Sequence, residues 1–357
     1  MDHGYQLLVE RADFSRARIE PLPAVPPLEP GEALLEIERL TLTANTLTYA
    51  RLGQSFGYWR VFPAPPGLAV NPGWGVARVV ASRADGLAKG QRLFGFLPLA
   101  SRHLVRPTRI GPGFVIDEAT RRAGVPTMYS LFQPLPDPPP ADETARVFLK
   151  PLALTSFLLA DYVLADGWFA ADAVVITSAS SKTAHALAFL LSRVPVPRPW
   201  VIGLTSPASV AFLEDCGAYD RVLAYDRLED LTPLRTLVLD FSGALDLVGR
   251  VHTHLGRHIV ASRLVGATHE AAAFEPHILP EPRPQVFFAP DHIRRRNAEL
   301  GEGWLDVGYE SALPSLLDWS KDWLRLQRPV GPEGLMSAWA DLNAGRTSPA
   351  EGLIVEP

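Results

Sequence analysis

The chain has 357 residues, of which 47% are apolar and 20% are charged, with a formal net charge of −5. This length and composition predict two domains with large buried cores and exclude a disordered chain. The negative charge argues against a general nucleic-acid-binding protein; without a membrane-length apolar stretch or an N-terminal signal, the sequence predicts a soluble cytoplasmic protein.

The first part of the chain has the pattern of a small, mostly antiparallel β domain. Apolar and charged residues alternate in Glu32–Leu42, and further strands are predicted at Gly75–Ser82, Gly90–Leu97 and His103–Val105. Gly and Pro separate these strands at short intervals. The proline-rich run Pro134–Pro140 is predicted to be a surface loop or linker, because proline disrupts helix interiors and central strands.

The pattern changes after residue 150. A helical period covers Pro151–Leu164, and the apolar runs Ala173–Thr177 and Trp200–Leu204 follow, with a predicted helix at Thr183–Arg193 between them. Short apolar strands that alternate with helices of about ten residues indicate βαβ units around a parallel sheet buried on both faces. This part of the chain has the pattern of a nucleotide-binding domain.

The predicted fold class is therefore α/β, with a β domain followed by a parallel-sheet domain. We assign residues 1–150 to the first domain and residues 151–290 to a dinucleotide-binding domain. Residues 291–357 are predicted to return to the first domain and complete it, because the chain ends in one more strand-like run at Leu353–Val355.

The segment with most chemical information is Val174–Leu187, which has the sequence VVITSASSKTAHAL. A buried strand ends at Thr177, small residues form a turn, and a helix begins near Ser181. In this arrangement, backbone N–H groups and the positive helix end can receive a dinucleotide pyrophosphate, although the usual glycines are absent. The turn residues predicted to bind the cofactor are Ser178, Ser180, Ser181, Lys182 and Thr183.

Two other interpretations of this turn stay open. A strand followed by a serine-capped helix needs no ligand. A degenerate P-loop is the second, because SSKT ends like G-K-[ST] and TLVLD (236–240) resembles a Walker-B strand. The two glycines of a P-loop would fall at Ile176 and Ser181, so this interpretation has little support.

The end of the next strand bears on the choice of cofactor. An enzyme selective for NAD(H) is expected to have Asp or Glu there to bind the ribose diol, but the chain has Thr205 and Ser206. Two hydroxyls, with Lys182 within reach, suit a 2′-phosphate better. The sequence therefore favours NADP(H) over NAD(H), while a simple helix cap remains the alternative use of these hydroxyls.

Several further segments have an order that is found in a known superfamily. They are ANTLTYARLGQ (44–54), NPGWGVARVVASRADGLAKGQRLFGF (71–96), PLALTSFLLADYVL (151–164), ITSASSKTAHALAFLL (176–191), FLEDCGAYDRVLAYD (212–226) and the C-terminal GRTSPAEGLIVEP (345–357). Together they resemble the medium-chain dehydrogenase/reductase superfamily, in its zinc-independent quinone-oxidoreductase and enoyl-reductase branch. Departures include Arg78, Gln91 and the turn, where the family has T-G-A-S-G-G-V-G, and they suggest a divergent subfamily.

The resemblance implies a chaperonin-10-like domain followed by a Rossmann-type domain. It also implies that Tyr225 matches a tyrosine that contacts the 2′-phosphate in some NADPH-dependent members, although the lysine of those members falls at Ser209. The other cofactor-binding positions carried over by the resemblance are Ser242, Gly243, Val265 and Gly266. The family commonly forms dimers, so a homodimer is expected, with Val286–Phe288 as an apolar edge strand.

No metal site is predicted. The segment NPGWG has no histidine where zinc-dependent members of the superfamily have a zinc ligand, and Cys216 is the only cysteine, which excludes a multi-thiolate site. His252, His254 and His258 lie close together in the sequence, and we expect them to be solvated surface residues.

Hydride transfer requires donors near developing negative charge and exclusion of water. Tyr49 or Tyr58 could donate a proton to an enolate or alkoxide oxygen, and Asn45 could hold a carbonyl or the cofactor carboxamide. Each aromatic residue could equally belong to the core of the β domain. The predicted function is an NADPH-dependent reductase of an activated carbonyl, enone or quinone; the alternative is a catalytically inactive member that binds a nucleotide or a partner.

Overall fold

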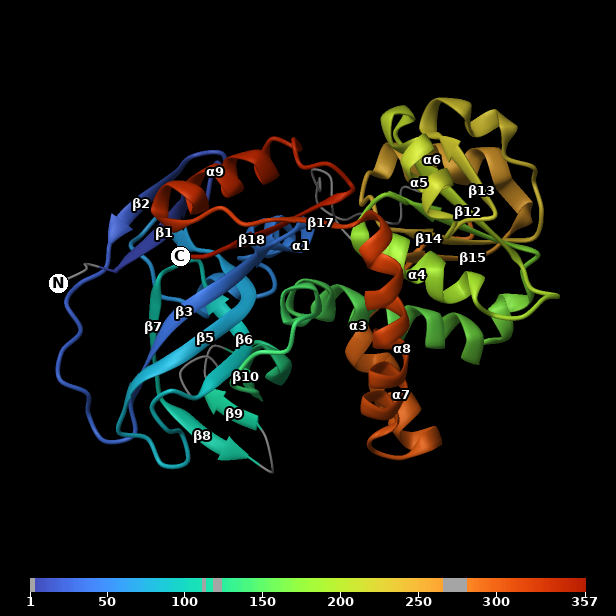
Figure 1. The fold of residues 1–357 in the computed structure, drawn as a ribbon. Coiled ribbons are helices and arrows are strands. Elements are labelled where there is room, and N and C mark those ends of the chain that lie inside the picture. The colour runs from blue at the N-terminus through green and yellow to red at the C-terminus, as the bar shows by residue number, and fades with distance from the viewer. Residues whose placement is uncertain (1–3, 111–113, 118–123, 266–280) are drawn as a thin grey trace. The chain divides into compact units, whose positions relative to one another are not determined.

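The computed structural model describes residues 4–110, 114–117, 124–265 and 281–357. The chain divides into two compact units. Unit 1 comprises Met1–Phe148 and Arg325–Pro357, and unit 2 comprises Leu149–Leu324. The architecture is α/β, with mostly antiparallel sheets in unit 1 and one parallel sheet in unit 2, so the predicted fold class is confirmed (Figure 1).

Unit 1 is built on two sheets. The smaller sheet has the strand order β2-β1-β4, and the larger one has the order β17-β18-β3-β5-β6-β10-β9-β8, with β7 also paired to β3. The strands are β1 (Tyr5–Glu10), β2 (Ala17–Pro21), β3 (Ala33–Leu42), β4 (Leu68–Val70), β5 (Pro72–Ser82), β6 (Arg92–Pro98), β7 (Arg102–Val105), β8 (Pro107–Ile110), β9 (Phe114–Asp117), β10 (Leu131–Leu135), β17 (Arg325–Gln327) and β18 (Glu351–Val355).

The helices of unit 1 are short. They are α1 (Ala44–Arg51), α9 (Gly331–Asn343) and the 3₁₀ helices Tyr58–Arg60 and Thr127–Ser130. Trp339 of α9 is buried, and its indole N–H donates to the carbonyl of Phe14 at 2.9 Å. The C-terminal strand β18 pairs antiparallel with β3, so the chain end does return to the N-terminal sheet.

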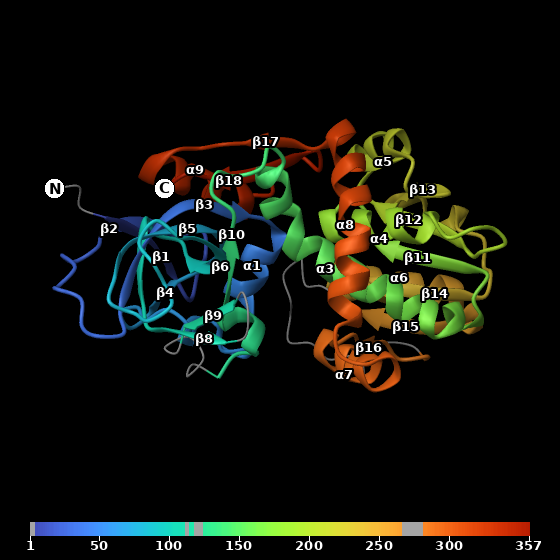
Figure 2. The ribbon, with the colours of Figure 1, turned by 60° about the horizontal axis from the view of Figure 1, so that its bottom comes forward.

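Unit 2 contains a six-stranded sheet in which every pairing is parallel, with the order β13-β12-β11-β14-β15-β16 (Figure 2). Its strands are β11 (Ala173–Thr177), β12 (Trp200–Thr205), β13 (Arg221–Ala224), β14 (Thr236–Asp240), β15 (Ile259–Leu264) and β16 (Gln285–Val286). Every residue of β11 and β14 is buried, as expected for central strands covered on both faces.

The helices of unit 2 include the connections between these strands. They are α4 (Lys182–Ser192), α5 (Val210–Cys216), α6 (Leu245–Leu255), α7 (Ala289–Leu300), α8 (Trp304–Trp323) and the 3₁₀ helices Gly167–Ala170, Pro207–Ser209, Tyr225–Asp230 and Gly256–His258.

His252 of α6 is buried and bonded to Ser262. The expectation that this histidine is solvated was therefore wrong, because its side chain lies on the apolar face of the helix.

Helix α3 (Glu143–Ala165) begins in unit 1 and ends in unit 2. Of the described helices, this one is long and apolar enough to cross a membrane by length and composition, but 56% of its most apolar window is buried inside the protein. Core helices of water-soluble domains have the same character, so α3 is weak evidence for a membrane span. Its first residue, Glu143, is buried and bonds Arg39 and Arg92.

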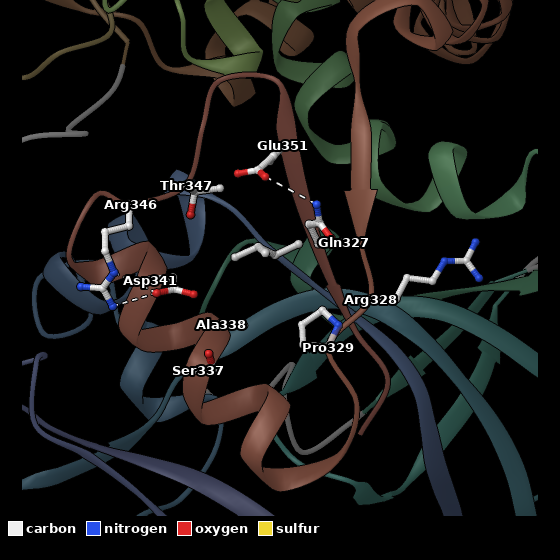
Figure 3. A pocket seen from close by; sticks show the side chains of 10 residues that line it. Gln327, Arg328, Pro329, Ser337, Ala338, Asp341, Arg346, Thr347 and Glu351 are labelled. Atoms are coloured by element: carbon white, nitrogen blue, oxygen red, sulfur yellow. Dashed lines mark hydrogen bonds and ion pairs between the residues drawn. The ribbon is translucent and has the colours of Figure 1, made fainter. Parts of the chain in front are cut away.

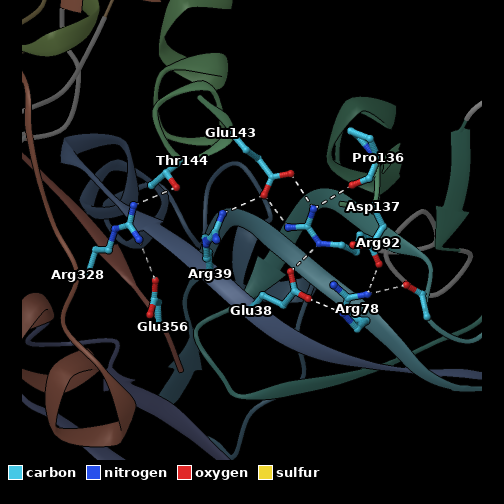
Figure 4. Close-up of polar contacts among 11 residues, drawn as sticks. Glu38, Arg39, Arg78, Arg92, Pro136, Asp137, Glu143, Thr144, Arg328 and Glu356 are labelled. Atoms are coloured by element: carbon cyan, nitrogen blue, oxygen red, sulfur yellow. Dashed lines mark hydrogen bonds and ion pairs between the residues drawn. The ribbon is translucent and has the colours of Figure 1, made fainter. Parts of the chain in front are cut away.

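These contacts belong to an ion-pair network that joins β3, β5, β6 and the start of α3 (Figure 4). The Arg92 guanidinium bonds both carboxylate oxygens of Glu143, at 2.7 and 2.6 Å, and its Nε donates to Glu38 at 2.9 Å. Arg78 also donates to Glu38 and reaches Asp137. The Arg92 and Glu143 side chains are 1% and 3% exposed, so their charges depend on one another for compensation.

Two expectations from the sequence need correction. Residues 291–324, assigned to the first domain, belong to unit 2, because α7 bonds Asp161 of α3 and the tryptophans of α8 pack on α4. Within the run predicted to be a loop, Pro134 and Leu135 are paired with β6 as the end of β10. Pro134 is accommodated near the strand end, where its missing N–H removes little of the ladder.

Candidate functional site

The segment between β11 and α4 forms the predicted turn. Ser178 has a left-handed backbone with φ of +49°, at a position where the resembled family has glycine. Such a conformation costs a non-glycine residue about 1 kcal/mol. Its N–H donates to the Tyr225 hydroxyl at 3.1 Å, and its carbonyl accepts from the Ser181 N–H at 2.8 Å. These contacts hold Ser178 in the strained conformation.

Helix α4 starts directly after this turn. The Ser181 side chain caps it by accepting from the Ala184 N–H at 3.4 Å. Lys182 and Thr183 therefore occupy the first helical turn, whose backbone N–H groups have no partner within the helix. Together with the positive end of the helix dipole and the Lys182 ammonium, this start is suited to a phosphate group.

Small residues allow the turn to lie against β12. A Cβ added to Gly203 would come within 3.0 Å of both the Ala179 Cβ and the Tyr219 ring, so the close approach requires glycine on β12 rather than in the turn. The Tyr219 hydroxyl donates to the Ala179 carbonyl at 2.9 Å. The close approach that glycines give the resembled family is thus achieved here with different residues.

The hydroxyls after β12 are engaged with their surroundings. Thr205 is buried and donates to the Ser180 hydroxyl at 3.1 Å, so this pair ties the turn to the end of β12. Ser206 and Ser209 share a hydrogen bond of 3.1 Å. The stretch 205–209 has no carboxylate, which leaves space for a phosphate without charge repulsion. Ser206 lies at the edge predicted for cofactor binding, whereas Thr205 supports the turn.

Asp240 organises the loop that follows β14, and sequence reasoning did not identify it as a site residue. Its side chain is fully buried, and it accepts hydrogen bonds from the Thr177 hydroxyl, from the N–H and hydroxyl of Ser242 and from the Gly243 N–H at 2.9 Å. The acid at the end of the apolar run TLVLD was the available signal. Ser242 and Gly243 therefore lie beside Thr177, at the same edge of the sheet.

Three further residues were predicted to bind the cofactor: Tyr225, Val265 and Gly266. The Tyr225 hydroxyl accepts from the Ser178 N–H, so in this structure it supports the turn; its contact with a 2′-phosphate stays a prediction. Val265 follows β15, and its N–H donates to the Asp240 carbonyl at 2.8 Å, which places it at the same edge. Gly266 lies outside the described residues.

The three predicted catalytic residues lie in unit 1. Asn45 is half-buried in the first turn of α1, whereas Tyr49 and Tyr58 are only 7% and 8% exposed. Both tyrosines belong to an aromatic cluster, which consists of Tyr49, Tyr58, Trp74, Phe96 and Tyr129. The Tyr49 hydroxyl accepts from the Trp74 indole N–H at 3.0 Å, and burial raises the pKa of both tyrosines. The sequence did not identify Trp74 or Tyr129, because the hydrogen bonds come from tertiary packing.

His185 lies in α4, one turn after Lys182. Its ring is buried against Trp319 and Trp323 of α8, with ring centroids 4.5 and 5.0 Å apart. Burial, with a contribution from the Lys182 charge, lowers the pKa of His185 to about 3. The imidazole is therefore neutral in the folded protein at physiological pH.

The lowered His185 pKa predicts acid sensitivity. Unfolding restores a pKa near 6.5, so the contribution to stability is fully present above pH 6.5 and is lost as the pH falls toward 3. Between pH 7.5 and 5 the free energy of unfolding should drop by about 2 kcal/mol from this group alone. Urea unfolding of wild type and His185→Phe at both pH values tests this. Equal pH dependence in the two proteins would refute it, because the other histidines titrate in both.

A cavity of about 520 Å³ also lies in unit 1, beside β17, β18 and α9 (Figure 3). Arg346 at its rim is bonded to Asp341 at 2.9 and 2.7 Å, and Gln327 reaches toward Glu351. The lining contains two basic and two acidic side chains, so it favours neither an anionic nor a cationic ligand. Among the described residues, no group of three or more His, Cys, Asp or Glu side chains could hold a metal ion.

Solved structures with similar folds cover almost the whole chain. CurA from Vibrio vulnificus, solved with NADPH, has a TM-score of 0.63 at 13% identity and covers 99% of this chain and 98% of its own. A putative NADPH:quinone reductase from Mesorhizobium loti has a TM-score of 0.62 at 16% identity, with 100% and 99% covered. A mutant enoyl thioester reductase from Candida tropicalis has a TM-score of 0.55 at 13% identity, with 100% of both chains covered.

These similarities, at low identity, establish the fold of the medium-chain reductases, with a chaperonin-10-like unit and a Rossmann-type unit. The predicted resemblance is thereby confirmed at the level of the fold. The family model described as "Protein of unknown function (DUF2855)" matches residues 40–348, and the chain belongs to this family. A search of the curated proteins found no match.

Proposed function

We propose that the protein is an NADPH-dependent, zinc-independent reductase of an activated carbonyl, enone or quinone. The observation that carries the proposal is the serine-capped start of α4 after β11, facing a β12 end without a carboxylate. These residues fit a dinucleotide carrying a 2′-phosphate, because they offer backbone N–H groups, a lysine and hydroxyls, and no competing negative charge. Structures with this fold that were solved with NADPH add support.

The cofactor would supply a hydride, and the residues of the chain would bind and orient it. The first turn of α4 would hold the pyrophosphate, Lys182 would contact the 2′-phosphate or the pyrophosphate, and Ser206 would face the adenosine ribose. Asp240 fixes the Ser242–Gly243 loop that lines the same sheet edge. In unit 1, the buried tyrosine hydroxyls are the candidate proton donors for the oxygen that becomes negative as the substrate is reduced.

The test of the proposal is NADPH oxidation by the full chain with a panel of enones, quinones and activated aldehydes, followed at the NADPH absorbance. Turnover with any class that depends on the protein supports the reductase. NADPH binding without turnover across the panel would contradict it and favour the inactive nucleotide-binding alternative.

Lys182 is predicted to strengthen NADPH binding. A charge-assisted contact to phosphate contributes about 1.5–3 kcal/mol, which corresponds to about a tenfold to hundredfold change in Kd. Lys182→Ala should weaken NADPH binding by that factor. If the contact is to the 2′-phosphate, NADH binding stays the same; if it is to the pyrophosphate, both weaken.

Lys321→Ala is the matched control, because Lys321 pairs with Asp318 at the exposed surface of α8 in the same unit. Fluorescence titration of both cofactors into both variants gives the four affinities. If Lys182→Ala binds both cofactors like the wild type, Lys182 has no part in binding.

We also propose that the protein is a cytoplasmic homodimer. In the described part of the chain, β16 is an edge of the parallel sheet; its Val286 and the following Phe288 are 58% and 45% exposed. An exposed apolar edge strand favours pairing with a second copy. The mass in solution at micromolar concentration tests this, and a monomer would contradict it.

A further inference from the structure

Two tyrosine hydroxyls meet within the aromatic cluster of unit 1. The hydroxyl oxygens of Tyr58 and Tyr129 are 3.1 Å apart, and their rings meet edge to face with centroids 5.4 Å apart. The two residues come from separate 3₁₀ helices, 71 positions apart in the chain. The contact therefore depends on the tertiary fold rather than on local structure.

A hydroxyl has a single proton, so the contact uses one proton of the pair and leaves the other available. Burial raises the pKa of Tyr58, and the hydrogen bond to Tyr129 lowers it. For Tyr129, burial raises the pKa most, and the neighbouring Tyr49 and Tyr58 raise it further. At 3.1 Å either hydroxyl can be the donor; when Tyr129 donates and the Tyr58 oxygen accepts, the bond favours the Tyr58 phenolate.

The surroundings of Tyr58 contain few other ionisable groups. Within the described part of the chain, the titratable groups that face it are Tyr129 and Tyr49 of α1, whose hydroxyl is already bonded to the Trp74 indole. The other ring neighbours are Phe96 of β6 and the half-exposed Phe56, which is nearly parallel to Tyr58. The Tyr129 hydroxyl is therefore the group best placed to influence the acidity of Tyr58.

We propose that Tyr129 is a positioning residue whose hydroxyl donates to the Tyr58 oxygen and so leaves the Tyr58 proton for the oxygen of the reduced substrate. The inference rests on the proposed function. Hydride addition makes the substrate oxygen negative; the Tyr58 O–H bond then breaks as the substrate O–H bond forms. The phenolate left on Tyr58 accepts from Tyr129 until solvent water returns a proton, which balances the cycle.

The first test measures the pKa of the Tyr58 hydroxyl and does not depend on enzyme activity. The full chain is labelled with fluorinated tyrosine, whose phenol is more acidic than that of tyrosine, and the Tyr58 signal is assigned by its loss in Tyr58→Phe. Tyr129→Phe should raise the Tyr58 pKa by about one unit, since it removes one hydrogen bond to the phenolate. An unchanged Tyr58 titration would overturn the proposal.

Tyr309→Phe is the matched control. It removes a buried tyrosine hydroxyl that donates to the Lys150 carbonyl at 2.9 Å in unit 2, far along the chain from the cluster. The Tyr58 titration should be the same in this variant as in the wild type. A shift as large as that of Tyr129→Phe would show a general effect of losing a buried hydroxyl and would overturn the proposal.

The second test uses turnover in a double-mutant cycle. If Tyr129 acts through Tyr58, Tyr129→Phe should lower kcat about tenfold with little change in KM, because one hydrogen bond to the reacting group is lost. The double variant should then be no slower than Tyr58→Phe alone. Losses that multiply in the double variant would overturn the proposal. A shifted Tyr58 titration with no turnover in the wild type or any variant would overturn the proposed function instead. The hydrogen bond from Tyr129 to Tyr58 would then still be supported.

Discussion

Arg92→Met should lower the free energy of unfolding by about 3–5 kcal/mol, because it leaves the buried Glu143 carboxylate without its main partner. Arg92 makes its two shortest contacts to Glu143, at 2.6 and 2.7 Å, and the two side chains are 1% and 3% exposed. Methionine replaces the aliphatic part of the arginine side chain without its charge, so most of the effect reports the lost charge compensation. Urea unfolding followed by circular dichroism measures it.

The matched control is Arg346→Met, since Arg346 also binds a carboxylate through two nitrogens. The Arg346 and Asp341 side chains are 60% and 44% exposed, so water replaces the lost partner and the cost should stay below about 1 kcal/mol. Adding Glu143→Gln to Arg92→Met should recover part of the loss. Equal costs for the two arginine variants would contradict the role assigned to the buried network.

Asp240→Asn should lower the free energy of unfolding by about 2–4 kcal/mol and weaken NADPH binding by at least about tenfold. The carboxylate accepts from the Thr177 hydroxyl on one oxygen and from the Gly243 N–H on the other. An asparagine amide turns one acceptor into a donor, so a donor then faces a donor in a site without solvent. Urea unfolding and fluorescence titration measure the two effects.

Asp246→Asn is the control for this change, because Asp246 lies exposed in the first turn of α6, close in sequence to the same loop. Its loss should cost about 0.5 kcal/mol through the helix dipole and leave NADPH affinity unchanged. If Asp240→Asn is as stable as this control and binds NADPH equally well, the loop does not depend on Asp240.

The strand–turn–helix at 174–187 and the parallel sheet could be predicted from the sequence. A fully apolar β11 and a serine-capped α4 are local features, and their alternation with further strands indicates the sheet. The strand at Leu353–Val355 and its return to the first domain could also be predicted, because the strand pattern is local; its pairing with β3 could not.

The assignment of α7 and α8 and the roles of individual hydroxyls could not be predicted. The tryptophans of α8 show an amphipathic helix, but the pattern does not say which unit it covers, and only packing against His185 and Phe189 settles it. In the same way, the sequence did not show that the Thr205 and Tyr225 hydroxyls bond Ser180 and Ser178 of the turn; their contact with a cofactor stays a prediction. Side-chain direction within a turn depends on tertiary contacts that spacing does not encode.

The central claim is that the start of α4 holds NADPH. Calorimetric titration of NADPH and of NADH into the full chain tests it most directly. We predict saturable binding of NADPH with an affinity at least about tenfold higher than that for NADH, as expected for one charge-assisted contact to the 2′-phosphate. Absence of binding for both dinucleotides would contradict the account.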